Sequence, residues 1–326
     1  MRKLPAILVV TMLFVVVAGP THAVVQCAVR DLGAGSIANG ISDVGTVGCK
    51  TAAVAWFKGR TINFGRYLPA GDSRAFGINN KGQVVGYTMD MSGNTAAFLY
   101  IGGRPEQTLV LPELIMAYSI DDAMNIYGYR QNEFGRLRGA ILQWAHGIIG
   151  ELEPLPGFTE SIANHGNTKL QAVGISQGEA GIHATIWNSE GVPADLHPEG
   201  ATYSFANSIN DAGQVAGSAE YWENGTLETK AFFWDANGIP TEIVPPAAGF
   251  CQANDINDLG QVCGTYRKTA EGVHQAFVWE KGVGGNNLVA TGWALTDAYG
   301  INDLGQVCGV GFYKGVGRAF VATPRR

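Results

Sequence analysis

Six aromatic side chains stand where this repetitive sequence does not repeat, and they are its best candidates for binding a ligand. They are Tyr67, Tyr118, Phe158, Tyr203, Phe250 and Trp293. Aromatic rings with polar neighbours are typical of sites for sugars and peptides, and the polar neighbours here are Asp72, Arg74, Glu160, Asn207 and Gln252. The competing interpretation is that the rings cap the hydrophobic core at the loop ends. Replacing Trp293 by alanine separates the two, since losing a ligand anchor weakens binding and losing a core cap lowers the melting temperature.

Known catalytic motifs are missing from the sequence. There is no HExxH, no GxSxG and no phosphate-binding glycine loop. The histidines beyond the N-terminal segment lack the spacing of metal ligands, and we interpret them as surface or strand residues. They are His146, His165, His183, His197 and His274.

Aspartates recur at one turn of the repeat and raise the question of calcium. They are Asp43, Asp122, Asp211, Asp258 and Asp303. Each turn offers one carboxylate and about one amide, whereas calcium takes six to eight oxygen ligands. Tight-turn chemistry explains these residues without an ion. We therefore expect no metal and no cofactor.

Glycoside hydrolysis needs only a pair of carboxylates about 5–10 Å apart, and a propeller channel can hold such a pair. Acidic residues are sparse here, however, and no repeat carries a distinctive extra Asp or Glu in its first strand. A binding or scaffolding module without catalysis is therefore the favoured function. A carbohydrate-active hydrolase or lyase with acidic residues in the channel is the alternative.

The elements that position these residues are visible in a recurring phrase. Its clear copies are GINNKGQVVGY at 77–87, SINDAGQVAGS at 208–218, DINDLGQVCGT at 255–265 and GINDLGQVCGV at 300–310. Weaker copies are GISDVGTVGCK at 40–50, SIDDAMNIYGY at 119–129 and, with an insertion, SIANHGNTKLQAVGI at 161–175. The isoleucine anchors are spaced by 37, 42, 42, 47, 47 and 45 residues, and they are Ile41, Ile78, Ile120, Ile162, Ile209, Ile256 and Ile301. This period predicts an all-β, seven-bladed β-propeller with four strands in each blade.

One repeat shows how each blade is made. A first strand at 205–210 ends in the turn Asp211-Ala212-Gly213, whose residues favour a tight hairpin. The third strand, at 230–234, reads KAFFW, and five of the seven tryptophans share its last position. Residues repeated in every blade serve what every blade shares, so we interpret these rings as packing between blades.

The ends of the chain have separate roles. Residues 1–23 combine Arg2 and Lys3, an apolar run and a small-residue cleavage site, which together predict a secretory signal peptide. Residues 24–326 then form one domain of seven repeats of about 43 residues. The last repeat stops after its third strand, so residues 25–33 are expected to complete the seventh blade and close the ring.

The surroundings of the mature protein follow from this leader. We expect a soluble, extracellular or periplasmic monomer with no membrane span after cleavage. The net charge of −6 becomes −8 when the two basic leader residues are removed, which disfavours nucleic acid. Five cysteines remain, an odd number whose pairing the sequence leaves open, namely Cys27, Cys49, Cys251, Cys263 and Cys308.

The phrase G-I-N-x-x-G-Q-V-V-G, followed by x-A-F-L-W and then D-L-G, resembles the bacterial HAF extracellular repeat family, named for a His-Ala-Phe triplet. The resemblance spans residues 24–326. The first residue of the triplet is histidine only at His183, which indicates that this histidine has no chemical duty. The resemblance implies secretion and a propeller-like fold, and it implies no particular activity. A glycan or a cell-surface protein remains the expected ligand.

Overall fold

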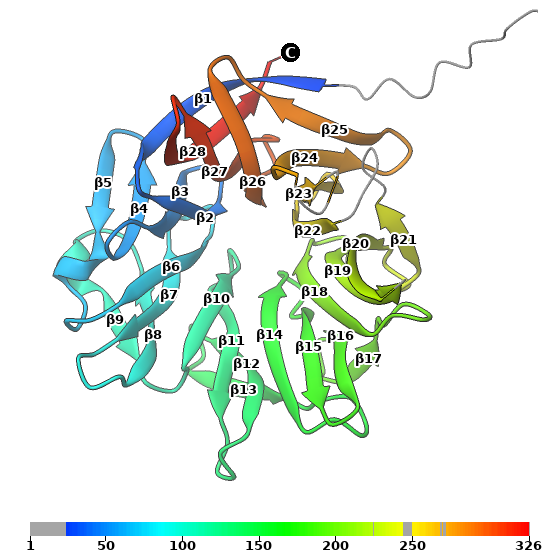
Figure 1. Cartoon of the computed structure of the whole chain (residues 1–326). Coiled ribbons are helices and arrows are strands. Elements are labelled where there is room, and N and C mark those ends of the chain that lie inside the picture. The colour runs from blue at the N-terminus through cyan, green and yellow to red at the C-terminus, as the bar shows by residue number, and fades with distance from the viewer. Residues whose placement is uncertain (1–23, 224, 244–249, 268, 270–271, 326) are drawn as a thin grey trace, which may run out of the picture.

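The computed structural model describes residues 24–325, apart from 224, 244–249, 268, 270 and 271. The described chain is all-β, with 28 strands and two short 3-10 helices, η1 (Phe64–Arg66) and η2 (Pro105–Gln107). Groups of four strands follow one another around a common centre (Figure 1), which makes the fold propeller-like. The expected signal peptide, residues 1–23, lies outside the described residues. No described helix has the length and hydropathy needed to cross a membrane.

The strands form seven units in chain order, each with its first strand nearest the centre (Figure 1). Unit 1 is β2 (Ile37–Ile41), β3 (Gly45–Cys49), β4 (Ala53–Phe57) and β5 (Arg60–Asn63). Unit 2 is β6 (Ser73–Ile78), β7 (Val84–Met89), β8 (Thr95–Tyr100) and β9 (Leu109–Leu111). Unit 3 is β10 (Met116–Ile120), β11 (Asn125–Gln131), β12 (Leu137–Gln143) and β13 (Ile148–Leu152). Unit 4 is β14 (Glu160–Gly166), β15 (Ala172–Gly178), β16 (Gly181–Trp187) and β17 (Pro193–Asp195).

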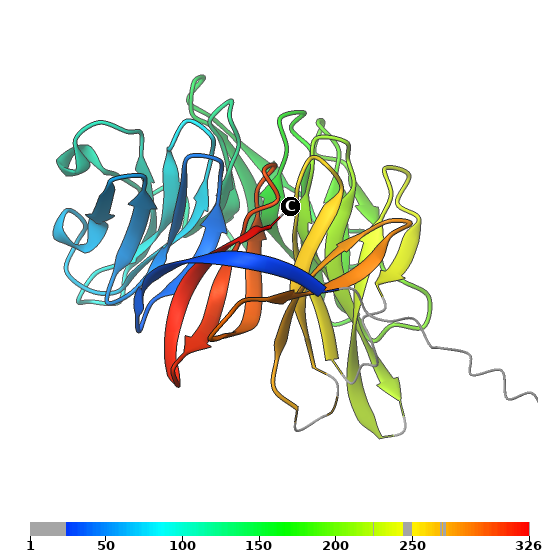
Figure 2. The same cartoon turned by 90° about the horizontal axis from the view of Figure 1, so that it is seen from above.

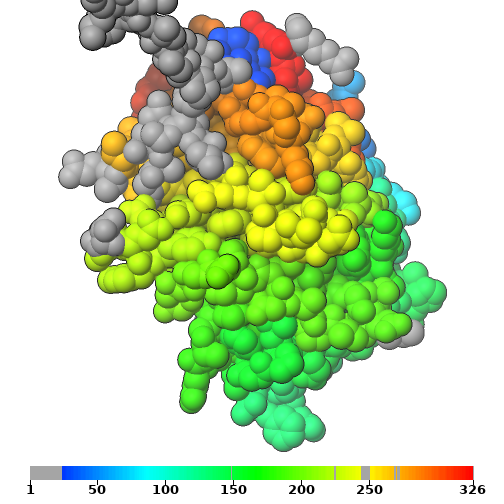
Figure 3. Space-filling model, turned by 90° about the vertical axis from the view of Figure 1, so that its right-hand side faces the viewer, coloured from blue at the N-terminus to red at the C-terminus, as the bar shows by residue number. Residues whose placement is uncertain are grey.

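The later units have longer strands. Unit 5 is β18 (Tyr203–Ile209), β19 (Val215–Glu223), β20 (Thr226–Trp234) and β21 (Pro240–Ile243). Unit 6 is β22 (Phe250–Ile256), β23 (Gln261–Arg267), β24 (Gln275–Glu280) and β25 (Gly284–Val289). Unit 7 is β26 (Trp293–Ile301), β27 (Val307–Tyr313) and β28 (Val316–Pro324), with β1 (Val24–Ala34) beside β28. Seen from the side, units 4 to 7 follow one another across the surface in chain order (Figure 3).

The sheets differ in how they connect. Units 1 to 4 are separate four-stranded sheets, whereas units 5 to 7 join into one twelve-stranded sheet. The joins are short, because β20 meets β22 only at Thr229 and Phe250, and β1 runs parallel to β25 only over 24–26. From Cys27 to Ala34, β1 instead pairs antiparallel with β28. Figure 2 shows β1 lying along β28 and reaching β25.

The Asn and Gln of the repeated phrase hold the first hairpin of a unit. In unit 2, Asn79 Oδ1 accepts the N–H groups of Lys81 and Gln83 at 3.1 and 3.0 Å, and Asn79 Nδ2 donates to Gln83 Oε1 at 2.6 Å. Gly82 adopts a φ of 75° in this turn, which favours glycine. The same Nδ2 also donates to the backbone oxygen of Asp121 in unit 3, at 2.8 Å. The phrase therefore makes a turn and ties two units together.

Five aromatic residues at the ends of the third strands are buried, as predicted, whereas Trp144 follows β12 and is half-buried. Tyr100, Trp187 and Trp234 are almost completely inaccessible to solvent, and Trp56 and Trp279 are buried as well. Trp187 Nε1 donates to a backbone oxygen of the preceding unit at 2.7 Å. Trp234 Nε1 likewise donates to the backbone oxygen of Leu196 at 2.9 Å. Burying such large rings contributes on the order of 2–3 kcal/mol each.

The position predicted for the repeated isoleucine in unit 4 is wrong by four residues. Gly166, and not Ile162, occupies the place of the repeated isoleucine at the end of β14. The following turn then matches the phrase without an insertion, because Asn167 Nδ2 donates to Gln171 Oε1 at 2.9 Å. Leu170 takes the glycine's place there with a φ of 60°. The seven units are thus more regular than the sequence indicates.

Tyr127 and Gly166 compensate for each other in size, and this explains why the copy of the phrase in unit 4 is hard to recognise in the sequence. Tyr127 of unit 3 occupies the register position that Val85 occupies in unit 2, and its larger ring reaches into unit 4. A Cβ atom on Gly166 would lie 2.0 Å from that ring, so isoleucine does not fit. Tyr127 Oη donates to the backbone oxygen of Asn167 at 2.8 Å, which restores a link between the two units.

The cysteines form no disulfide within the described residues. Four are buried and Cys49 is half-buried. Burial raises the pKa of the Cys27 thiol to about 11, so that thiol stays protonated and unreactive at neutral pH.

Candidate functional site

A β-bulge recurs at the same place in all seven first strands and shapes the centre of the molecule. In each first strand the register shifts after the alanine that the units share there. The residues at the bulge are Asn39, Phe76, Tyr118, Asn164, Asn207, Asn254 and Tyr299. All of them line one cavity of about 370 Å³, which we call the axial cavity. A bulge re-aims side chains, so neighbouring residues of one strand can face the same space.

The asparagines of the axial cavity link neighbouring units. Asn39 Nδ2 donates to the backbone oxygen of Ala75 in the next unit at 3.0 Å. Asn164, Asn207 and Asn254 donate in the same way from unit 4 to 5, from 5 to 6 and from 6 to 7, at 3.0, 2.8 and 2.7 Å. These amides are held in place by the fold, so the polar part of the wall is preorganised.

The aromatic residues occupy the bulges where no asparagine stands. Phe76 and Tyr118 lie side by side in units 2 and 3, with ring centroids 5.3 Å apart. Tyr299 comes from unit 7. Burial raises the pKa of both Tyr118 and Tyr299 to about 12. Their hydroxyl groups therefore remain protonated at neutral pH and can donate hydrogen bonds.

Asp255 places a carboxylate in the wall, one residue after the bulge of β22. Its Oδ1 accepts hydrogen bonds from Ser208 Oγ at 2.6 Å and Ile256 N at 2.9 Å, and its Oδ2 accepts one from Ile301 N at 2.8 Å. Asp255 is half-buried, and it lines the axial cavity. Desolvation raises the pKa of Asp255 above its usual value, and the neighbouring His165 opposes that shift.

The prediction that no first strand carries a distinctive acid is wrong, because Asp255 lies in β22 and lines the cavity. His165 is a strand residue, as predicted, since it lies in β14, and it also lines the cavity, which was not predicted. The sequence did distinguish Asp255, because the copy of the repeated phrase at 255–258 begins with Asp, whereas the other clear copies begin with Gly or Ser.

His165, Ser208 and Asp255 come from three successive first strands, yet they do not form a catalytic triad. Ser208 donates directly to the carboxylate of Asp255, whereas in a triad the histidine lies between serine and carboxylate. The Nδ1 atom of His165 instead lies 3.4 Å from the donor N–H of Ile209 and 3.2 Å from its backbone oxygen. The arrangement favours a rigid, polar binding wall over an activated nucleophile.

A second cavity of about 180 Å³ continues from the axial cavity to the turns after the first strands. We call it the acidic mouth, since the five turn aspartates line it, namely Asp43, Asp122, Asp211, Asp258 and Asp303. Asp258 Oδ1 accepts the N–H of Asp211, and Asp303 Oδ1 accepts the N–H of Asp258, both at 2.8 Å. Desolvation, together with the charges of Asp303 and Asp211, raises the pKa of Asp258. Among the described residues no group of three or more His, Cys, Asp or Glu has the arrangement of a metal site.

Of the six aromatic residues predicted to bind a ligand, Tyr118 lines the axial cavity. The other five lie at or before the starts of the first strands, and they do not line the axial cavity. Phe158 packs on His183 at 4.8 Å, and Phe250 lies parallel to His274 at 5.5 Å. Tyr67 follows η1 and is 40% exposed. Tyr203 begins β18 and is half-buried.

Trp293 has the contacts of a core cap. Its ring lies 5.3 Å from that of Tyr313 and 6.3 Å from that of Phe320, and it packs on the buried cluster of units 6 and 7. We therefore expect Trp293→Ala to lower stability by roughly 1–3 kcal/mol, or several degrees in melting temperature. Thermal unfolding checks this, and an unchanged melting temperature with weakened ligand binding would restore the ligand-anchor interpretation.

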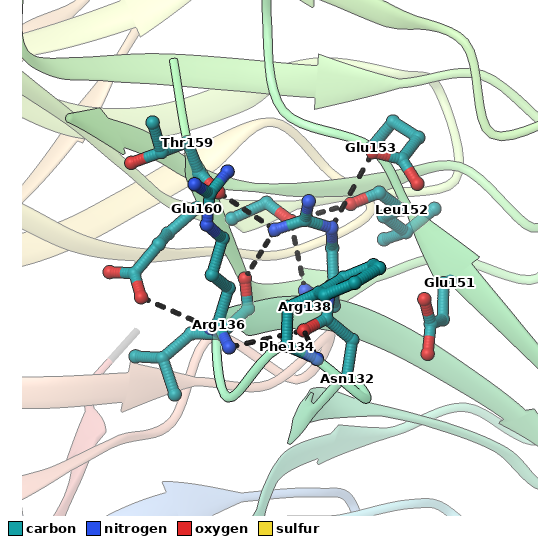
Figure 4. A network of polar contacts seen from close by, with 12 residues as sticks. Asn132, Phe134, Arg136, Arg138, Glu151, Leu152, Glu153, Thr159 and Glu160 are labelled. Carbon is teal, nitrogen blue, oxygen red and sulfur yellow. Dashed lines mark hydrogen bonds and ion pairs between the residues drawn. The ribbon is translucent and has the colours of Figure 1, made fainter.

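A third cavity, beside the hairpin of β11 and β12, holds a network of charges (Figure 4). Arg138 is buried, and its Nη1 donates to the backbone oxygen of Thr159 at 2.8 Å. Its Nε lies 3.4 Å from Glu153 in a geometry that makes no hydrogen bond. Arg130 lies 3.5 Å from Glu151. Because the arginines have carboxylate partners and Arg138 bonds across to unit 4, this network is best explained as a link between units 3 and 4.

Comparison with known proteins places the fold and leaves the activity open. Residues 160–285 match a family described as "Protein of unknown function (DUF3466)", and no curated protein matches the chain. The β-propeller domain of the Trilobed protease from Pyrococcus furiosus, reported to have an open velcro topology, is similar with a TM-score of 0.51 and 11% identity, over 77% of this chain and 84% of that one.

Two further solved structures are similar. Pyrococcus horikoshii acylaminoacyl peptidase gives a TM-score of 0.52 and 9% identity over 85% of this chain, and TolB from Acinetobacter baumannii gives 0.49 and 11% over 74%. The chain spans 49% of the length of the peptidase and 64% of TolB. At such low identity the likeness concerns the fold. The fold and the axial cavity together define a β-propeller-like protein with a candidate ligand site at its centre.

Proposed function

We propose that this protein is a secreted, non-catalytic binding module, a seven-bladed β-propeller closed by β1, whose ligand enters the axial cavity. The closure is supported by two contacts between the ends of the chain. β1 pairs with β28 over 27–34, and Asn302 Nδ2 of unit 7 donates to the backbone oxygen of Ser42 in unit 1 at 3.2 Å. The second bond repeats the link that the phrase makes between other neighbouring units.

The observation that carries the binding function is the composition of the axial cavity. Its wall combines fixed amides with the rings of Phe76, Tyr118 and Tyr299. Its volume of about 370 Å³ falls in the range of small-molecule sites. Aromatic faces with fixed hydrogen-bonding groups suit the alternating apolar and hydroxyl faces of a sugar, so a glycan end is the ligand class we favour.

Binding is favoured over glycoside hydrolysis for a chemical reason. Hydrolysis uses two carboxylates that flank the scissile bond, whereas Asp255 is the one carboxylate described around the axial cavity itself, and the others line the acidic mouth. That carboxylate is already held by Ser208 and two backbone N–H groups. Hydrolysis is therefore the less favoured function.

A glycan-binding screen of the mature protein, with product analysis on the same glycans, tests the proposal. We expect a bound glycan without product, and Tyr118→Ala should weaken its binding about tenfold or more. Phe134→Ala is the matched control, because Phe134 is 78% exposed on a hairpin outside the axial cavity. Products that depend on Asp255, or a Tyr118→Ala variant that folds and binds normally, would contradict the proposal.

A further inference from the structure

The acidic mouth and the axial cavity together are lined by many more acidic than basic side chains. The residues lining the acidic mouth include seven carboxylates, namely Asp43, Asp121, Asp122, Asp211, Asp255, Asp258 and Asp303. The described residues lining the two cavities include no Lys or Arg, and His165 is the one basic side chain among them. Walls of low dielectric concentrate the field of such charges and raise the local concentration of cations.

In its ionised form, which a bound cation favours, Asp255 has room for one more hydrogen bond. A carboxylate offers about four acceptor positions, and the protein fills three of them, two on Oδ1 and one on Oδ2. The open position is on Oδ2, and Asp255 is a half-buried residue that lines the axial cavity. A donor on a ligand can therefore reach a carboxylate that the fold already holds rigidly.

Aromatic faces share the cavity with this carboxylate. Phe76 and Tyr118 form a pair on one part of the wall, and Tyr299 belongs to unit 7, next to the unit that supplies Asp255. The glycines that follow two of the bulges, Gly40 and Gly77, let neighbouring first strands pack closely around the cavity, because a Cβ atom there would lie 2.3 Å from Phe76 O or 2.9 Å from Tyr118 O. Rings of this kind attract a cation placed over their faces, most strongly when water is excluded.

From this juxtaposition we infer that the axial cavity selects a ligand bearing a protonated amine, such as an amino sugar with a free amino group. The ammonium donates to Oδ2 of Asp255, and the carbon skeleton packs on Phe76 and Tyr118. The acidic mouth draws the cation toward the cavity. This inference rests on the proposed binding function and names its ligand class.

A matched pair of probes tests the inference. The β-1,4-linked glucosamine dimer and its N-acetylated form share one skeleton and differ in charge, and both are titrated calorimetrically into the mature protein at pH 6.5. We expect the amine form to bind about tenfold or more tightly and to weaken as salt is added. Asp255→Asn should abolish that preference, whereas the control Asp235→Asn, in the turn between β20 and β21, should keep it.

The outcomes separate the inference from the function it rests on. Equal binding of the two dimers, or a screen whose tightest ligands are uncharged, overturns the inference and leaves the binding function standing. The absence of any glycan ligand overturns both. If Asp255→Asn fails to fold, Phe76→Leu replaces it, because leucine keeps an apolar side chain without the ring, and it should reduce the preference severalfold.

Discussion

Deletion of residues 24–34 should leave a protein that aggregates, or that unfolds at a temperature lower by roughly 10 °C or more. β1 provides the antiparallel partner of β28 from Cys27 to Ala34 and a parallel partner of β25 from 24 to 26. Its removal exposes the backbone groups of both strands along their edges, and free edges invite pairing between molecules. Cys27 also leaves a buried cluster that contains Leu288. Thermal unfolding and light scattering of the truncated and mature proteins measure the effect.

A milder change provides the control for this deletion. Asp31→Asn removes the ion pair between Asp31 and Arg318 while β1 keeps its backbone pairing. Such partly exposed pairs contribute about 0–1 kcal/mol, so the melting temperature should change by only a few degrees. If the deletion has no larger effect than Asp31→Asn, β1 is an unstructured leader in solution and the proposed closure fails.

The regular features of the fold could be predicted from the sequence because their causes are local. Asn79, Gln83 and Gly82 make a hairpin from their own side chains and backbone, and the same three residue types recur in other units. Unit 4 departs from this pattern through a contact between units. Position 166 needs a glycine because the ring of Tyr127, which lies in a different repeat, fills the space that a side chain would take.

The candidate site was less predictable because the β-bulges determine which side chains face the centre. In a regular strand Asn254 and Asp255 would point to opposite faces, whereas both line the axial cavity. The aromatic residues at the strand entrances were easier to notice, yet of the six only Tyr118 lines that cavity. Comparing the variable residue before each repeated isoleucine would have singled out Asp255.

The pH dependence of stability should reveal Asp255 directly. Desolvation raises the pKa of Asp255 in the fold, so the folded protein holds this proton more tightly than the unfolded chain does. The stabilisation is therefore complete below the usual carboxyl pKa of about 4 and is lost as pH rises through the folded-state pKa. Relative to Asp255→Asn, the wild type should lose stability with rising pH, by up to about 1.4 kcal/mol for each pH unit inside that window.

Urea unfolding of both proteins between pH 3 and pH 8 measures this difference, and Asp90→Asn is a control of opposite sign. Hydrogen bonds from Asn94 lower the pKa of Asp90, so there the wild type should gain stability over its variant as pH rises to about 5, and the difference should stay constant above that. Asp255→Ala should be less stable than wild type by ~2–4 kcal/mol, because Ser208 and the N–H groups of Ile256 and Ile301 lose their acceptor. A wild type that gains on Asp255→Asn with rising pH would mean that these three hydrogen bonds outweigh desolvation, and that Asp255 is a structural anchor kept ionised by the fold.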